Sequence, residues 1–165
     1  MRKALILALI LFSGCLGEGF AMSESNRSDN PVQIKKIIYQ FHDASVPPQY
    51  HRSYVITVTP GMAKIVIDSY GDILAGKQNK ITEKQFEGIV KSLRKNGIKN
   101  VKLKDNEGCT GGTGESISYS DEQKEIFSGT VYHCGGIDSG NLGGDIKSFA
   151  EDVKKLIKKW PDTKK

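Results

Sequence analysis

The chain has 165 residues, a mass of 18.1 kDa and 38% hydrophobic residues, which is enough for one folded domain with its own core. Charged residues make up 26% of the sequence, close to the average of soluble domains, which excludes a wholly disordered chain and a collagen-like repeat. The formal net charge is +5, but no basic stripe interleaved with aromatic residues accompanies it, so the composition does not point to nucleic acid.

The first residues have the pattern of an export signal. Arg2 and Lys3 precede the apolar run 4–12, which is far shorter than the ~20 residues that a membrane-spanning helix needs. This pattern predicts a signal peptide over residues 1–14. The run ends in Leu-Phe-Ser-Gly-Cys, which resembles the lipobox of bacterial lipoproteins and implies that the chain is cut before Cys15 and lipidated on it. An ordinary signal peptide cut after Ala21 is the alternative.

The lipobox resemblance has consequences for charge and location. Cleavage before Cys15 removes Arg2 and Lys3 and no acidic residue, so the net charge falls by two, to +3. Leu16, rather than Asp, follows the cysteine, which favours the periplasmic face of the outer membrane if the host has one. The small polar residues of segment 15–31 cannot bury enough apolar surface to fold, so they are expected to form a tether to the membrane.

The globular domain is expected to cover residues 32–165 and to begin with β-structure. Apolar residues alternate with polar ones, and Pro60-Gly61 and Gly71-Asp72 mark turns, a pattern typical of hairpins. The strands predicted in this half cover residues 32–41, 54–59 and 65–67, with an extension toward Lys80.

The clearest local signal is that of a helix over residues 83–96. Thr82 and Gln85 have the spacing of a capping box, and the apolar residues that follow share one helical face. Gly97 predicts a C-terminal stop of the Schellman type, with Ile98 folding back onto the last turn.

The second half of the chain adds further strands and a final helix. Alternation predicts strands around 101–103, 117–119 and 126–134, and an apolar stripe predicts a helix over 145–159. Acidic residues early in that helix and lysines late in it suit the helix dipole. The predicted fold class is α+β: one domain with a mostly antiparallel sheet of hairpins, two helices on one face, and one disulfide.

Cysteine usage agrees with export. With Cys15 as the lipid site, Cys109 and Cys134 remain, and an even pair in an exported domain predicts a disulfide between them. A metal site that uses Cys134 and His133 is the alternative, although the chain lacks the paired C-x-x-C spacing of zinc sites. We therefore expect no metal and no cofactor.

Two glycine-rich segments, 108–115 and 133–145, are predicted to be loops that the disulfide holds side by side. The first lacks the Gly-Lys-Ser/Thr ending of a phosphate-binding loop, and a strand rather than a helix is expected after it. Both segments are expected to be turns or, together, a binding surface. The candidate surface consists of Thr110, Thr113, Glu115, His133, Asp138 and Asn141.

No catalytic motif identifies an enzyme, so no catalytic residue is predicted. An envelope hydrolase that uses Glu115, His133 and Asp138 remains an alternative. The segment Ser128-Gly129-Thr130-Val131-Tyr132 is similar to the Ser-Gly-x-x-Tyr motif of bacterial membrane-bound lysozyme inhibitors. That resemblance implies an inhibitory role for Ser128 and Tyr132, but it also implies an all-β barrel, and the two expected helices depart from that fold.

The layout as a whole resembles small bacterial envelope lipoproteins, which implies no particular activity. We expect an extracytoplasmic, lipid-anchored protein that binds an envelope protein or a small ligand without catalysing a reaction.

Overall fold

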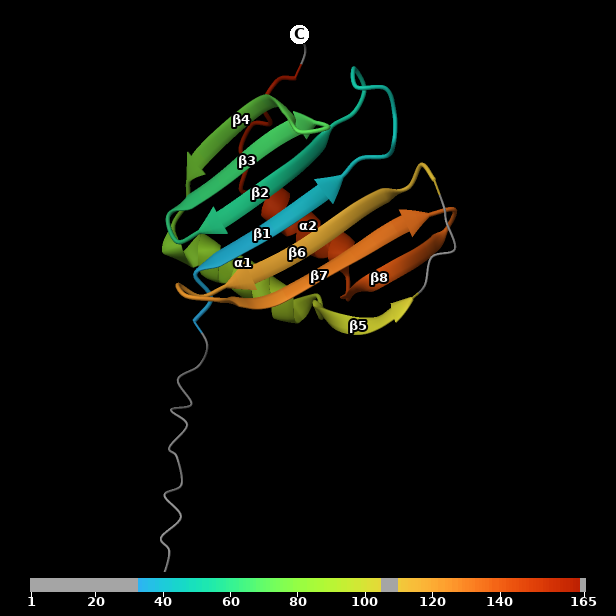
Figure 1. The fold of residues 1–165 in the computed structure, drawn as a ribbon. Coiled ribbons are helices and arrows are strands. Elements are labelled where there is room, and N and C mark those ends of the chain that lie inside the picture. Colours follow the sequence, from blue (N-terminus) through green and yellow to red (C-terminus); the bar gives the residue numbers. More distant parts are fainter. Residues whose placement is uncertain (1–32, 105–109, 164–165) are drawn as a thin grey trace, which may run out of the picture. The chain divides into compact units, whose positions relative to one another are not determined.

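The structure, a computed structural model, describes residues 33–104 and 110–163 (Figure 1). The predicted signal peptide, the tether with Cys15, and Cys109 lie outside the described residues.

The described residues form eight strands and two helices. In chain order they are β1 (Lys36–His42), β2 (Ser53–Thr59), β3 (Met62–Ser69), β4 (Asp72–Lys80), α1 (Glu83–Lys95), β5 (Lys99–Lys104), β6 (Thr113–Ser120), β7 (Glu125–Cys134), β8 (Ile137–Gly143) and α2 (Ile146–Lys154).

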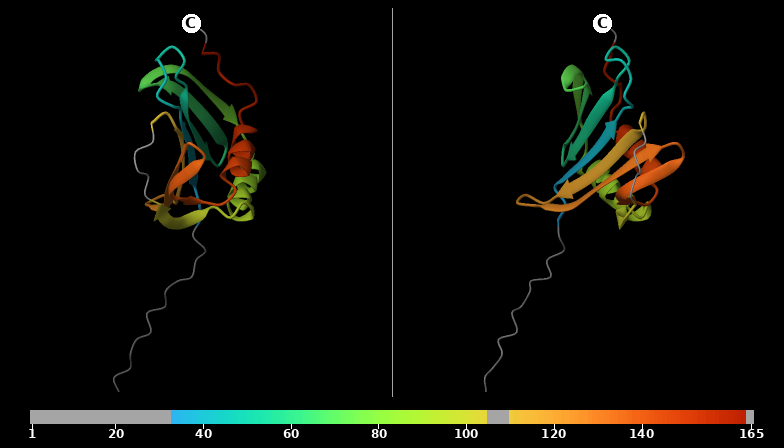
Figure 2. Two further views of the ribbon diagram at one scale, coloured as in Figure 1. Left: turned by 90° about the vertical axis from the view of Figure 1, so that its right-hand side faces the viewer. Right: turned by 45° about the vertical axis from the view of Figure 1, so that its right-hand side comes forward.

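All eight strands belong to one sheet in the order β4-β3-β2-β1-β6-β7-β8-β5, and every neighbouring pair is antiparallel. The first strand of the domain therefore lies in the middle of the sheet and joins two groups of hairpins. Both helices cover the same face of the sheet, as the turned views show (Figure 2). The prediction of an α+β fold with a mostly antiparallel sheet and two helices is confirmed.

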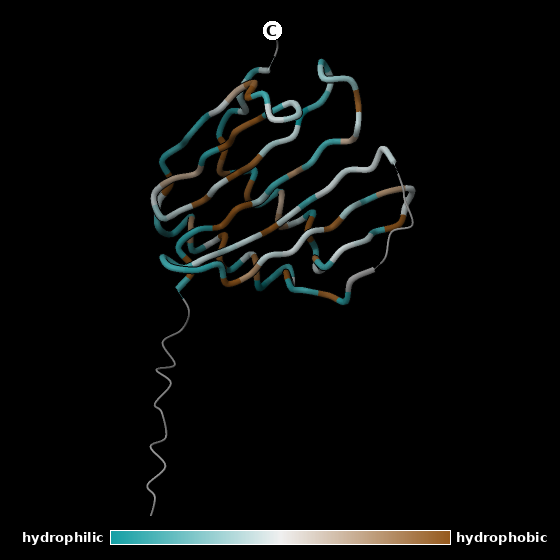
Figure 3. Tube along the Cα trace, in the orientation of Figure 1, coloured by the Kyte–Doolittle hydropathy of each residue, from teal (hydrophilic) through white to brown (hydrophobic). Residues whose placement is uncertain are grey.

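The core lies between this face and the helices. In β1, Ile37 and Tyr39 are fully buried whereas Lys36 is exposed, which is the alternation expected of a strand with one covered face. Hydrophobic segments accordingly recur along the central strands and the helices (Figure 3). From the helices, the core receives Phe86, Ile89, Leu93, Phe149, Ala150 and Val153.

The ends of α1 follow the predicted signals. The Thr82 side chain accepts a hydrogen bond from the backbone N–H of Gln85, and the Gln85 side chain accepts one from the N–H of Thr82, so the capping box is complete. At the other end, the N–H of Ile98 donates to the carbonyl of Leu93, the pattern of a Schellman motif, with Gly97 at a φ of +63°.

The helix α2 is shorter than predicted. Asp145 caps its start by accepting from the N–H of Ser148, but the helix ends at Lys154 rather than at 159. Leu156 and Ile157 continue the apolar stripe and are buried, although they lie in turns after the helix. The apolar stripe therefore identified core residues correctly, but the predicted end of the helix was wrong.

The second glycine-rich segment is a hairpin, not a loop. The strands β7 and β8 turn at Gly135-Gly136, where both glycines have positive φ, and β8 was not predicted. The first segment likewise passes into β6 at Thr113. The two segments are therefore neighbouring strand ends rather than two loops.

Gly144 is required where the start of α2 meets the end of α1. Its φ is +112°, and a Cβ atom there would lie 2.5 Å from the carbonyl oxygen of Gly97. The N–H of Asp145 donates to the carbonyl of Asn96 at 2.8 Å across the same junction. Close backbone approach therefore sets the junction between the two helices.

We predict that Gly144→Ala destabilises the domain by about 2 kcal/mol or more, because it combines backbone strain with a collision. The matched control is Gly88→Ala, at an exposed position inside α1 where a Cβ meets nothing within 4 Å. That change should raise the free energy of unfolding by about 0.5–1 kcal/mol. Chemical denaturation measures both, and an unchanged midpoint for Gly144→Ala would contradict the proposed role of the junction.

Candidate functional site

The predicted surface residues lie mainly on three neighbouring strands. Thr113 pairs with His133 across β6 and β7, and His133 pairs with Asp138 across β7 and β8. Glu115, two residues after Thr113, points to the same side of the sheet. Paired residues of antiparallel strands also point to the same side, so the register brings these four side chains together. The strand ends that carry them lie at the right of Figure 1.

His133 is the centre of this arrangement. Its Nδ1 lies 2.7 Å from Asp138 Oδ1, and its Nε2 lies 3.0 Å from Glu115 Oε2. The side chain of Glu115 is 16% exposed, that of His133 34% and that of Asp138 60%. The three groups therefore lead from the interior to the surface.

Tyr39 extends the cluster into the core. Its hydroxyl donates to Glu115 Oε1 at 2.5 Å, so both oxygens of Glu115 have a partner. We call Tyr39, Glu115, His133 and Asp138 the histidine cluster. It ties β1, β6, β7 and β8 together at one end of the sheet.

Tyr39 was missed in the sequence, although a signal for it exists. It lies between Ile37 and Phe41 in an alternating strand, which places its ring in the core, and a buried tyrosine hydroxyl needs a hydrogen-bond partner. Glu115 is 76 residues away, so its identity as that partner depends on the pairing of β1 with β6.

The surroundings of the cluster set its protonation. Burial lowers the pKa of His133, but the hydrogen bonds and charges of Asp138 and Glu115 outweigh burial, so the pKa lies above its usual value. Burial and the hydrogen bond to Glu115 raise the pKa of Tyr39 well above its usual value, so its hydroxyl remains a donor. The two neighbouring carboxyl groups therefore favour the protonated form of the ring.

This arrangement limits the chemistry available to His133. Each ring nitrogen lies within hydrogen-bond distance of a carboxylate oxygen, so neither nitrogen is free to take a proton from a substrate in this arrangement. The ring also fills the space between Glu115 and Asp138, where a paired-carboxylate glycosidase needs its substrate and water. The geometry suits a fixed polar surface better than acid–base catalysis.

The remaining predicted surface residues lie around the cluster or away from it. Thr113 is half-buried beside His133, and Thr110 is exposed in the segment before β6. Asn141 does not join them, since its Oδ1 accepts from the backbone N–H of Thr130 at 2.9 Å, just beyond the last paired residues of β7 and β8. The structure thus brings together Thr113, Glu115, His133 and Asp138.

Cys134 faces away from the histidine cluster. Consecutive residues of a strand point to opposite faces, so Cys134 and His133 in β7 do not share a site. Among the described residues, no group of three or more His, Cys, Asp or Glu side chains is arranged to hold a metal ion. The alternative of a metal site on Cys134 and His133 therefore has no support in the geometry.

An aromatic row adjoins the cluster on the same face. Phe41 pairs with Glu115 across β1 and β6, and its ring stacks on that of Tyr54 with centroids 5.2 Å apart. Trp160, 39% exposed, meets Tyr54 edge-on at 5.1 Å. These contacts make one continuous row from the segment after α2 to the histidine cluster, which the sequence did not indicate.

The Ser-Gly-x-x-Tyr segment lies on the opposite, uncovered face of the sheet. Ser128 is exposed, whereas Tyr132 is half-buried and its hydroxyl accepts from the N–H of Gly112 at 3.0 Å. The sheet is open, with β4 and β5 at its edges, and two helices cover its other face. This architecture differs from the all-β barrel that the resemblance implied.

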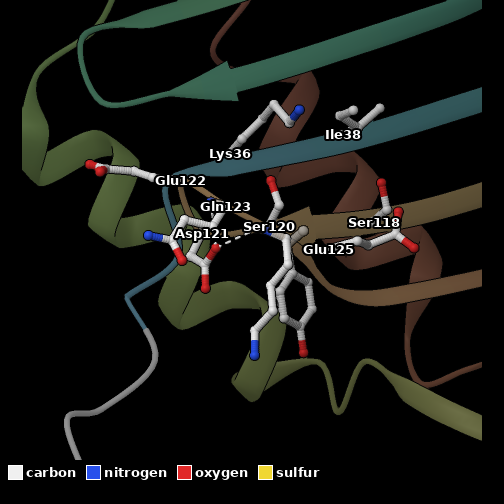
Figure 4. A pocket seen from close by; sticks show the side chains of 10 residues that line it. Lys36, Ile38, Ser118, Ser120, Asp121, Glu122, Gln123 and Glu125 are labelled. Atoms are coloured by element: carbon white, nitrogen blue, oxygen red, sulfur yellow. Dashed lines mark hydrogen bonds between the residues drawn. The ribbon is translucent and has the colours of Figure 1, made fainter.

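A shallow pocket of about 220 Å³ lies at the other end of β6, beneath its turn to β7 (Figure 4). Its lining includes Lys36, Ser118, Ser120 and Glu125, and no member of the histidine cluster. The polar side chains around it are short or solvent-exposed, and they do not converge on one point.

No protein-family model, curated protein or solved structure matches this chain. Within the described residues, neither helix has the length and apolar character that crossing a bilayer requires. Function is therefore argued from the residues and their geometry.

The histidine cluster predicts a pH dependence of stability. Because the pKa of His133 is raised in the folded state, the contribution of its protonated form is fully present below the unfolded value of about 6.5 and is lost as pH rises through the folded value. We expect the free energy of unfolding to fall as pH rises above about 6.5, and His133→Gln to reduce this dependence.

The matched control is His42→Gln, at an exposed position on the opposite face of β1. This variant should keep the pH dependence of the native chain. Urea denaturation at several pH values measures the three proteins, and identical profiles for His133→Gln and the native chain would show that the cluster does not stabilise the fold through its charge.

Proposed function

We propose that this chain is a lipid-anchored protein of the bacterial cell envelope whose folded domain binds a partner without catalysing a reaction. The proposed binding surface surrounds the histidine cluster and includes Thr113, Glu115, His133 and Asp138, with Thr110 beside it. The anchor is a lipid on Cys15, and segment 15–31 is the tether.

The observation that carries this proposal is the convergence of predicted surface residues at one end of the sheet. Hydrogen bonds fix the polar groups of Glu115, His133 and Asp138, and His133 and Asp138 remain partly exposed. Side chains that are already ordered lose little conformational entropy on binding, so such a surface is prepared for recognition. A hydrolase would need an unoccupied base, which this arrangement does not offer.

A disulfide between Cys109 and Cys134 belongs to the same proposal. Cys134 Sγ lies 3.8 Å from the carbonyl oxygen of Thr110, and Thr110 follows Cys109 directly in the sequence, which supports the pairing. The bond would fix the segment before β6 against the end of β7. In the chain-entropy model, a loop of this length contributes roughly 3 kcal/mol to stability.

Intact-mass analysis of protein extracted from membranes tests the anchor and the disulfide together. We expect a chain that begins at a lipidated Cys15 and whose mass rises by two hydrogens on reduction. The Cys15→Ser variant should leave the membrane fraction. A soluble species that begins at Met22 would contradict the anchor, and an unchanged mass on reduction would contradict the disulfide.

Site-specific photo-crosslinking in the bacterial envelope tests the binding surface. We expect a photoreactive residue at position 113, beside the histidine cluster, to form an adduct. The matched control is position 128, which is exposed on the other face of the sheet. Absence of an adduct at 113, or an adduct at 128 alone, would contradict the proposed surface.

A further inference from the structure

The face that carries the histidine cluster presents a longer surface than the cluster itself. We call it the aromatic–acid strip and define it as Trp160, Tyr54, Phe41, Thr113, His133 and Asp138. Trp160 touches Tyr54, Tyr54 stacks on Phe41, and Phe41 pairs with Glu115 of the histidine cluster. The members come from β1, β2, β6, β7, β8 and the segment after α2.

The strip crosses several strands rather than running along one. From β2 to β8 there are four steps between neighbouring strands. At about 4.8 Å a step, this distance is about 19 Å. That length suits an extended ligand with several repeating units better than a single small molecule.

The two ends of the strip differ in chemistry. At one end, Trp160 is 39% exposed and offers aromatic surface at which an apolar ring face can stack, and the half-buried Tyr54 lies beside it. At the other end, Asp138 accepts hydrogen bonds, Thr113 can donate and accept, and the partly exposed His133 is held in place. A ligand with apolar ring faces and hydroxyl groups matches the chemistry of both ends.

The charges around the strip have no dominant sign. Beside its aromatic end, burial lowers the pKa of Lys154, but Tyr54 and Glu151 outweigh this effect and hold it above its usual value. Arg52 donates from its Nε to Thr163 Oγ1 at 3.1 Å. Glu115 and Asp138 flank the ring of His133 at the other end. Lys154, beside Tyr54, would repel a basic peptide at the aromatic end, whereas a neutral ligand meets no such repulsion.

We infer that the aromatic–acid strip binds a saccharide chain, with sugar rings stacked at Trp160 and hydroxyl groups bound at Thr113 and Asp138. Sugar rings supply the apolar faces, the hydroxyl groups and the repeating length that the strip requires. This inference rests on the proposed function, because it names the ligand class of the same surface.

The test uses Trp160 as a reporter, because it is the only tryptophan of the chain. Its emission is recorded while the full lipid-free domain, residues 22–165, is titrated with chitotetraose and with cellotetraose. Purified peptidoglycan, as an insoluble probe, is tested by co-sedimentation. We expect a saturable change in emission with at least one oligosaccharide, and retention on peptidoglycan.

Variants locate the binding. Asp138→Asn and Thr113→Val should each weaken binding about tenfold, and Trp160→Ala should reduce co-sedimentation by a similar factor. The matched controls are Asp72→Asn and Ile73→Ala, which change an exposed carboxylate and an exposed apolar side chain on β4. These controls should bind like the native chain. Thermal unfolding confirms that each variant is folded.

Two results would overturn the inference: no binding to any of the three probes, or binding that the strip variants leave unchanged. Saturable binding of trilysine, with no binding of the saccharides, would also overturn the inference, because it would assign the strip to a cationic peptide. If the saccharides fail while position 113 still forms its adduct, the proposed function stands and only the ligand class is wrong.

Discussion

The pairing of β1 with β6 is the constraint on which the domain depends. Ile37 meets Tyr119 and Phe41 meets Glu115 along this pair, and it is the only direct link between the β1–β4 hairpins and the β6–β8 hairpins within the described sheet. Neither group can complete its covered face alone. Pairing between residues about 80 positions apart must overcome the entropy of closing a long loop, so we expect the sheet to be completed after its hairpins form.

The histidine cluster is a product of the same pairing. Tyr39 can reach Glu115 only when the two strands are in register, and a slip by one residue would turn Glu115 to the uncovered face. In that position, the buried hydroxyl of Tyr39 would lose its acceptor and the free energy of one hydrogen bond. The polar cluster therefore specifies the register at this end, while the apolar residues of the core specify it in the middle.

Sequence patterns predicted the elements whose signals are local. The start of α1 depends on Thr82 and Gln85, and its end on Gly97, all within one helical turn of the boundary that they set. The strand β8 was missed because glycines interrupt its alternation, and their role emerges only from close contact with β7. A Cβ on Gly140 would lie 2.2 Å from the carbonyl oxygen of Thr130, a contact that no pattern in the sequence reveals.

The sequence predicted several residues of the site but not their arrangement or their aromatic neighbours. Glu115, His133 and Asp138 were selected because chemically capable residues gather in the glycine-rich segments, and the register of three strands joins them. Tyr39 and the row of Phe41, Tyr54 and Trp160 could not be selected in the same way. Aromatic residues in a strand or after a helix usually signal a core, and only the folded sheet places these beside the acids.

The direction of β1 separates the point where the chain enters the described sheet from the histidine cluster. The chain enters the described sheet at Lys36, whereas Phe41 and the histidine cluster lie at the opposite end of this strand. Seven residues of extended chain separate the two ends by about 20 Å. The point where the chain enters the described sheet and the histidine cluster therefore lie at opposite ends of β1.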